Sequence, residues 1–227
     1  MSKLKVGLKR KPPIVLSGRE IEDLMAAPNV RCRTGLRNRA MLAAMHGAGL
    51  RVSEVVRLGV HDLDWSHGTL KIRNRRGGRD RNVPVSAETL AWLRAWAEKR
   101  PRQAEAFFCT LAGGKVSARY VWGMVKRLAA RAGLKRANDV SPRVLRHTHA
   151  TDLLDGGFTL PEVQQLLGHA QLSTTRVYLH ARPASLAARI QGPDRKAAEE
   201  LGRRITAMSD EDAKKLLMEI LSMVKVG

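Results

Sequence analysis

Residues 141–147 read Ser-Pro-Arg-Val-Leu-Arg-His and combine the start of a helix with a concentration of positive charge. The serine and the proline stand in the order that favours an N-cap followed by the first helical residue. Arg143 and Arg146 are three residues apart, which places them on one helical face near the positive end of the helix dipole. Counting His147, three cations would repel one another there unless an anion binds. The segment therefore predicts a helix that starts with an anion site, and two solvated arginines are the plainer alternative.

Amphipathic segments with start and stop signals surround this helix on both sides. Ser17 followed by Glu20 forms a capping box, and serines precede several of the other apolar-periodic segments. We expect helices over residues 17–27, 36–46, 53–58, 86–99, 117–132, 141–155 and 161–168, and a C-terminal one over residues 209–224.

Residues 68–85 change to the alternation that is typical of strands. Apolar and polar residues alternate on either side of the sequence Arg-Arg-Gly-Gly-Arg-Asp. The pattern predicts a two-stranded hairpin with a cationic tip. The predicted fold class is therefore mainly α (α+β): helical, with a small antiparallel β-sheet and a C-terminal helical tail.

The chain of 227 residues has 41 Lys and Arg against 21 Asp and Glu, a formal net charge of +20. A compact surface with this excess repels itself unless a polyanion neutralises it, so nucleic acid is the expected partner. An arginine-rich proteome is the alternative, because it would produce the same bias without a binding role. No apolar run is long enough to cross a bilayer or to form a signal peptide. We therefore expect a cytoplasmic, nucleoid-associated protein with no membrane partner.

The residue types that several other chemistries require are missing from the sequence. Cys32 and Cys109 are the two cysteines, and they lack the spacing of a zinc site. No cluster of carboxylates is placed to hold the divalent ions of a metal-dependent nuclease. No Gly-rich phosphate loop indicates ATP hydrolysis. We therefore expect no metal, no nucleotide and no other cofactor, and a reaction that conserves bond energy.

Three further residues stand out in short motifs. Arg51 lies in Gly-Leu-Arg-Val-Ser-Glu, where its plainer interpretation is a surface arginine paired with Glu54. His169 ends the sequence Leu-Leu-Gly-His. Tyr178 ends Ser-Thr-Thr-Arg-Val-Tyr, in a basic, polar-flanked turn where a tyrosine is available as a nucleophile. Arginines, a histidine and a tyrosine without a carboxylate cluster indicate metal-free chemistry.

These motifs, in this order, resemble the tyrosine recombinases of the phage integrase family. The resemblance covers about residues 17–183 and includes the motifs around Arg51, Arg146, His169 and Tyr178, as well as the basic hairpin. It implies a catalytic domain in which Tyr178 attacks a scissile DNA phosphate, giving a 3′-phosphotyrosyl bond and a free 5′-hydroxyl. Arg51 and Arg146 would hold the non-bridging oxygens, and His169 would donate a hydrogen bond to the same phosphate.

Two positions depart from the pattern of that family. The hairpin position where the family carries a general-acid lysine falls on Arg76, and a guanidinium is a poor proton donor. Lys71, five residues earlier, lies too far along the strand to replace it. Arg143 stands where the family usually has a histidine, so it can bind phosphate but should not accept a proton. The expected DNA contacts are Arg75, Arg76, Arg79 and Arg143.

The chain is expected to divide into a basic arm over residues 1–16, a catalytic domain over residues 17–185 and a helical tail over residues 186–227. The N-terminal helical domain with which family members usually complete a clamp around DNA is expected to be absent. The chain would then be either a shortened form or a naturally short protein. The apolar stripe of the tail either packs on its own domain or mediates self-assembly on DNA.

Two functions follow from these expectations. The first is a site-specific recombinase or integrase that cleaves and rejoins DNA strands, with reduced activity if Arg76 and Arg143 slow proton transfer. The alternative is a recombinase-like DNA-binding protein, catalytically weak or silent, that acts as a competitor or architectural partner. The target sequence is left open, because phosphate contacts carry no information about base sequence. The direction of recombination and any accessory proteins are left open too.

Overall fold

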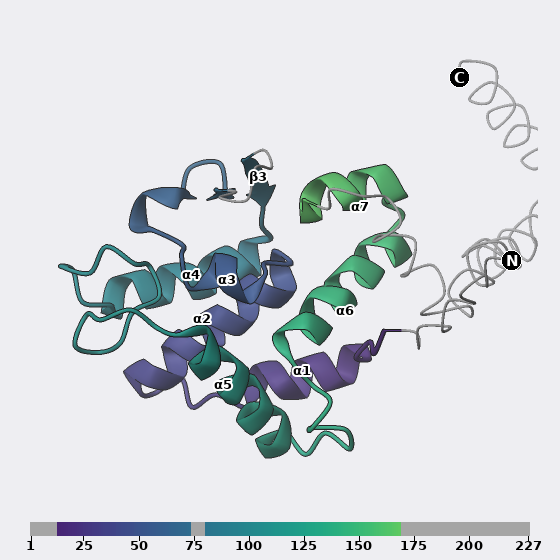
Figure 1. Cartoon of the computed structure of the whole chain (residues 1–227), viewed down its shortest axis with the longest axis horizontal. Helices are drawn as coiled ribbons and strands as arrows, with labels where there is room; N and C mark the ends of the chain where they lie inside the picture. The colour runs from purple at the N-terminus through teal and green to yellow at the C-terminus, as the bar shows by residue number, and fades with distance from the viewer. Residues whose placement is uncertain (1–12, 74–79, 169–227) are drawn as a thin grey trace, which may run out of the picture. The chain divides into compact units, whose positions relative to one another are not determined.

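The computed structural model describes residues 13–73 and 80–168. Both ranges belong to one of the two compact units of the chain, residues 1–182. Along them the chain forms α1 (Gly18–Ala26), α2 (Arg33–Gly47), α3 (Val52–Val55), the short 3-10 helix η1 (Val60–Asp62), α4 (Ala87–Lys99), α5 (Ala118–Arg131), α6 (Pro142–Asp155) and α7 (Leu160–Leu167) (Figure 1). None of these helices is long and apolar enough to cross a membrane.

α2 is the helix on which most of the others pack. It contacts α1, α3, α4 and α6, and its residues from Arg39 to Met45 are all buried. A helix that is covered on all sides cannot keep a polar stripe in water. Its charged residue in this run, Arg39, is accordingly paired with Glu88 of α4 at 3.1 Å. The mainly helical fold is therefore built around a central buried helix.

The small antiparallel sheet follows α3 in the chain. β1 (Leu63–Asp64), β2 (Thr69–Ile72) and β3 (Arg81–Pro84) pair in the order β1-β2-β3. Leu70 lies opposite Val83, and both are buried in the core. The predicted hairpin of β2 and β3 is confirmed. β1 is an additional third strand, and two residues are too few for alternation to show in a sequence.

The end of the predicted basic arm is attached to the domain. Leu16 is 3 % exposed, and its backbone N–H donates to Thr148 Oγ1 at 3.0 Å. The predicted capping box is confirmed: Ser17 Oγ accepts from the Glu20 N–H at 3.3 Å, and the Glu20 carboxylate accepts from the Ser17 N–H at 2.8 Å. The arm therefore ends inside the core of the domain, while its residues 1–12 lie outside the described ranges.

α6 and α7 pack against each other and border the candidate site. Ser141 caps α6 by accepting from the Val144 N–H at 3.4 Å, with Pro142 in the first turn as predicted. α7 ends before Gly168, whose φ of 64° is left-handed and suits glycine. α7 also contacts β3. The two helices are joined by a separate apolar cluster of Ala150, Leu154, Val163 and Leu167.

Candidate active site

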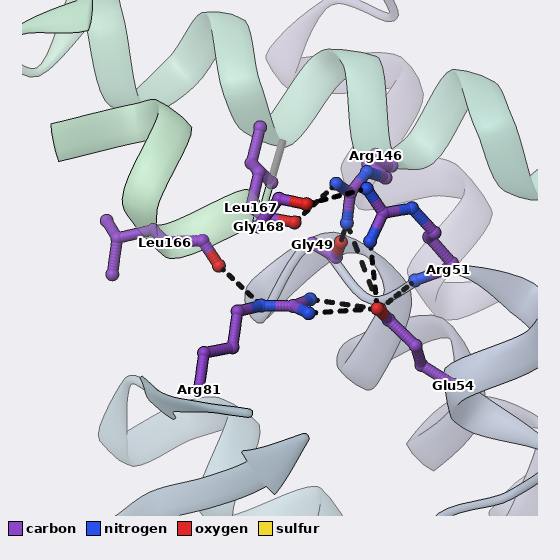
Figure 2. Close-up of polar contacts among 8 residues, drawn as sticks. All are labelled: Gly49, Arg51, Glu54, Arg81, Arg146, Leu166, Leu167 and Gly168. Carbon is purple, nitrogen blue, oxygen red and sulfur yellow. Dashed lines mark hydrogen bonds and ion pairs between the residues drawn. The ribbon is translucent and has the colours of Figure 1, made fainter. Parts of the chain in front are cut away.

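Glu54 of α3 lies at the centre of a cluster of arginines (Figure 2). Arg81 binds both of its carboxylate oxygens, with Nη1 donating to Oε1 at 2.9 Å and Nη2 donating to Oε2 at 3.0 Å. Arg51 Nη1 donates to Oε1 at 2.9 Å, and the Arg51 backbone N–H donates to Oε2 at 2.8 Å. Arg146 Nη1 lies 3.9 Å from Oε2. One carboxylate therefore faces three guanidinium groups.

Three separate elements bring these arginines together. Arg51 is the N-cap of α3, Arg81 begins β3, and Arg146 lies in the second turn of α6. The bend before Arg51 is made by Gly49, which has a φ of 59°. A Cβ at Gly49 would lie 2.5 Å from His149 Cδ2. The carbonyl oxygen of Gly49 accepts a hydrogen bond from Arg146 Nη1. Backbone conformation and the close approach of α6 both require glycine here.

The last carbonyls of α7 accept hydrogen bonds from the same three arginines. The carbonyl oxygens of residues 166, 167 and 168 accept from Arg81 Nε at 2.9 Å, Arg146 Nη2 at 2.6 Å and Arg51 Nη2 at 3.1 Å, in that order. These carbonyls form the negative end of the helix dipole, where cations are favourable. The arginine cluster therefore fixes the end of α7, from which the chain continues to His169.

The cluster carries more positive than negative charge. Three guanidinium groups against one carboxylate leave an excess of two positive charges, and the side chains of Arg51, Arg81 and Arg146 are 39 %, 10 % and 7 % exposed. Burial alone would raise the pKa of Glu54, but the hydrogen bonds and charge of Arg81, helped by the other two arginines, lower it below its usual value. Glu54 therefore stays ionised. The result is a partly exposed cationic site that suits an anion such as phosphate.

α6 presents its charges differently from the prediction. Arg143 is exposed, whereas Arg146 is buried and donates to the end of α7. His147 is not a third cation, because burial and the charges of Arg143 and Arg146 lower its pKa to about 4. The predicted repulsion is present, because both arginines lower the pKa of this histidine, and it leaves Arg143 and Arg146 as the two cations of the helix start. Arg146 also faces Glu54, with its Nη1 3.9 Å from the carboxylate.

The sequence analysis does not predict a role for Arg81, and it names Glu54 only as the partner of Arg51. That pair is confirmed at 2.9 Å. A signal for Arg81 exists, because it lies two residues before the buried Val83 and alternation therefore places it on the inward face of β3. A buried arginine requires a partner. An arginine on the inward face of a short strand therefore indicates a buried acidic partner, and here that partner is Glu54.

Several candidate residues lie outside the described residues. The hairpin tip is described up to Arg73 and again from Asp80, and the description of the C-terminal part ends at Gly168. Among the residues that are described, no group of three or more His, Cys, Asp or Glu side chains could hold a metal ion. The candidates outside the described ranges are Arg75, Arg76, Arg79, His169 and Tyr178.

Residues 15–185 match the family model of the phage integrase family. The chain belongs to this family. The resemblance of its motifs is thereby confirmed. The fold is shared with solved recombinases: the XerA recombinase has a TM-score of 0.70 at 27 % identity, covering 78 % of this chain and 64 % of that one. XerH bound to its palindromic difH substrate in a post-cleavage complex has a TM-score of 0.67 at 28 % identity, covering 78 % and 52 %.

Curated relatives of this family member are named tyrosine recombinases. XerD of Ralstonia nicotianae is 41 % identical over 174 residues, which cover 74 % of this chain and 56 % of that protein. XerD of Lacticaseibacillus casei is 39 % identical over 174 residues, covering 74 % and 58 %. The chain thus spans somewhat more than half the length of these relatives. The family match includes the whole of the arginine cluster.

Proposed function

We propose that this chain is a site-specific DNA recombinase that cleaves and rejoins strands through a covalent 3′-phosphotyrosyl intermediate at Tyr178. The observation that carries the proposal is the arginine cluster, in which Arg51 and Arg146 converge with an excess of positive charge inside a phage integrase family domain. Relatives named tyrosine recombinases support the activity. XerH, solved with its difH substrate, supports double-stranded DNA as the partner.

The proposed reaction exchanges a phosphodiester bond of the DNA for a phosphotyrosyl bond and later restores it. Tyr178 Oη loses its proton and attacks the scissile phosphorus, and the 5′-oxygen leaves and becomes a hydroxyl by gaining a proton. The phosphate has one negative charge before attack and two in the pentavalent transition state. Arg51 and Arg146 neutralise this charge, and His169 donates a hydrogen bond. A 5′-hydroxyl of another strand then reverses the step, so no water or cofactor is consumed.

Arg143 favours a second candidate function. It is exposed on α6, at the position where the family usually has a histidine, and a guanidinium cannot accept the tyrosine proton. Arg76 would be equally unable to protonate the leaving oxygen. A protein with both arginines binds DNA phosphates but cleaves weakly or not at all. The second candidate is therefore a recombinase-like protein that competes for recombination sites or shapes the DNA there.

The proposal includes a location and a mode of assembly. We place the protein in the cytoplasm on the nucleoid, where its net charge of +20 is neutralised by DNA. Copies of the chain would assemble on DNA through the apolar stripe of residues 209–224. That stripe lies in the proposed tail, which is outside the described residues.

Covalent adduct formation tests the recombinase proposal. A pool of nicked duplexes with randomised sequence samples many candidate target sites, and each cleaved duplex releases a short strand, which traps the adduct that a denaturing gel then resolves. We expect an adduct with the wild type and none with Tyr178→Phe. Tyr120→Phe is the matched control, because the Tyr120 hydroxyl serves the fold by accepting from Arg37 at 2.6 Å and donating to Asn38 at 3.0 Å. It should keep the adduct.

Two results would contradict the proposal in different ways. A wild type that binds these duplexes in a gel shift but forms no adduct would support the DNA-binding protein instead. An adduct formed by Tyr178→Phe would show that another residue is the nucleophile.

A further inference from the structure

Arg81 holds Glu54 more completely than either of the other arginines. Its Nη1 and Nη2 bind the two carboxylate oxygens at 2.9 and 3.0 Å, the two-pronged geometry that makes arginine–carboxylate pairs strong. The side chains of Arg81 and Glu54 are 10 % and 12 % exposed, so water and salt screen the pair little. Arg81 is thus placed to neutralise Glu54 and not to reach a ligand.

The charge that this neutralisation leaves over matches the proposed chemistry. When Arg81 and Glu54 cancel, the two remaining positive charges belong to Arg51 and Arg146. Two is also the negative charge of a pentavalent phosphorane. Without Arg81, the carboxylate would draw on Arg51, which it contacts at 2.9 Å, and on Arg146 at 3.9 Å. One positive charge fewer would then face the phosphate.

Arg81 also fixes the end of α7. Its Nε donates to the Leu166 carbonyl at 2.9 Å. A Cβ on Gly168 would lie 2.9 Å from Arg81 Nη1 and 3.1 Å from its Cδ, so the glycine backbone lies directly against this side chain. The residue after Gly168 is His169, the proposed hydrogen-bond donor to the phosphate. Arg81 therefore connects β3 to the helix end that leads to a second proposed phosphate contact.

On the basis of the recombinase function proposed above, we infer that Arg81 is a positioning residue: it neutralises Glu54 and holds the end of α7, so that Arg51 and Arg146 keep their charge for the scissile phosphate. Arg81 itself does not touch the substrate. The competing explanation gives it only a structural role, as a tie between β3 and α7. The two explanations differ in what happens when Glu54 loses its charge together with Arg81.

A double-mutant comparison separates the two roles. Arg81→Gln, Glu54→Gln and the double variant are assayed for the rate of adduct formation on saturating nicked duplex, and for affinity to the same duplex in a Tyr178→Phe background. Arg39→Gln is the matched control, because Arg39 is 8 % exposed and pairs with Glu88 at 3.1 Å away from the cluster. Rates are divided by the folded fraction, which circular dichroism measures.

Arg81→Gln leaves a buried carboxylate without its main partner, and we expect the adduct rate to fall about 10- to 100-fold. The affinity for DNA should fall by less than the rate. Removing the charge of Glu54 as well restores the excess of two positive charges, so the double variant should recover a rate about tenfold above that of Arg81→Gln. Arg39→Gln should keep the wild-type rate per folded molecule.

A double variant as slow as Arg81→Gln, or slower, would show a structural tie only and overturn the inference. If neither the wild type nor Arg39→Gln forms an adduct, the recombinase proposal fails separately. The same comparison is then made in DNA affinity, where a double variant that binds no more tightly than Arg81→Gln overturns the role of Arg81.

Discussion

Arginine and lysine carry the same charge but differ in the protons that they can give, and this difference matters at Arg76. A guanidinium neutralises charge without releasing a proton near neutral pH. Arg51, whose side chain is 39 % exposed, needs to supply only positive charge and paired N–H donors, and arginine supplies both. In the proposed reaction Arg76 takes the position of a general acid, where the departing 5′-oxygen would need a proton as well. We therefore expect the chemical step, and not DNA binding, to be slow.

A substrate with sulfur in place of the bridging 5′-oxygen tests this expectation, because a thiolate leaves without a proton. The wild type should cleave the sulfur substrate faster than the oxygen one by the contribution of one general acid, about 10²- to 10⁴-fold. Arg76→Lys should accelerate the oxygen reaction and hardly change the sulfur reaction. Arg75→Lys, at the neighbouring position, is the control and should accelerate neither. Equal wild-type rates on the two substrates would mean that water or another residue supplies the proton.

Local signals explain most of the described helices. Ser17, Ser86, Ser117 and Ser141 each cap a helix as predicted. A hydroxyl just before a helix accepts an N–H that has no partner within it, so such residues mark helix starts in the sequence. Gly168 ends α7 for a similarly local reason, its left-handed backbone. Elements with their own start and stop residues were therefore predictable.

Features without such signals were not predictable. α2 begins at Arg33, earlier than predicted, because Cys32 acts as an uncommon N-cap and accepts from the Gly35 N–H at 3.4 Å. β1 and η1 are two and three residues long, too short for a period to show. The contact of Arg81 with Glu54 joins residues 27 positions apart. Spacing along a chain predicts neighbours on one helix or strand but not contacts made by folding.

α6 carries two histidines that are neutral in the folded domain near pH 7. Their lowered pKa values make the stability of the domain depend on pH. Burial and the charges of Arg143 and Arg146 lower the pKa of His147 to about 4, and burial with the nearby His46 lowers that of His149 to about 4. The unfolded chain binds these protons near pH 6.5 and the folded chain only near pH 4. The free energy of unfolding therefore falls as the pH drops from 6.5 toward 4. His149 should account for about 2 to 3 kcal/mol of this loss.

Urea unfolding at about pH 7 and about pH 4.5 measures the effect. His149→Gln should show a smaller difference in unfolding free energy between the two conditions than the wild type. His61→Gln removes an exposed histidine and should behave as the wild type does. If His149→Gln keeps the full difference, groups other than this histidine cause the acid sensitivity.

The charge of the whole chain exceeds what its own acidic residues can balance. With 41 basic and 21 acidic side chains, at least 20 positive charges have no acidic partner of their own. Some of the ion pairs in the described part of the chain involve largely exposed side chains, such as Arg73 with Asp62 and Arg136 with Asp139, and such pairs contribute little to stability. An uncompensated excess of this size destabilises a compact molecule through self-repulsion, and a bound polyanion removes the repulsion. The molecule as a whole is therefore suited to a long, evenly charged partner.

DNA affinity should accordingly fall steeply with salt, because each lysine or arginine that contacts a phosphate releases condensed counterions. A protein with about six to ten such contacts loses about 10³- to 10⁵-fold in affinity between about 50 and 200 mM salt. Replacing Arg75, Arg76 and Arg79 together by alanine should reduce the slope of log affinity against log salt by up to about 3. Arg39→Gln removes one buried, paired cation and should leave the slope unchanged. Fluorescence anisotropy of a random-sequence duplex over this salt range measures the affinity of the wild type and the slope of each variant. A wild-type affinity that does not change with salt would mean that the excess of arginine is compositional bias alone.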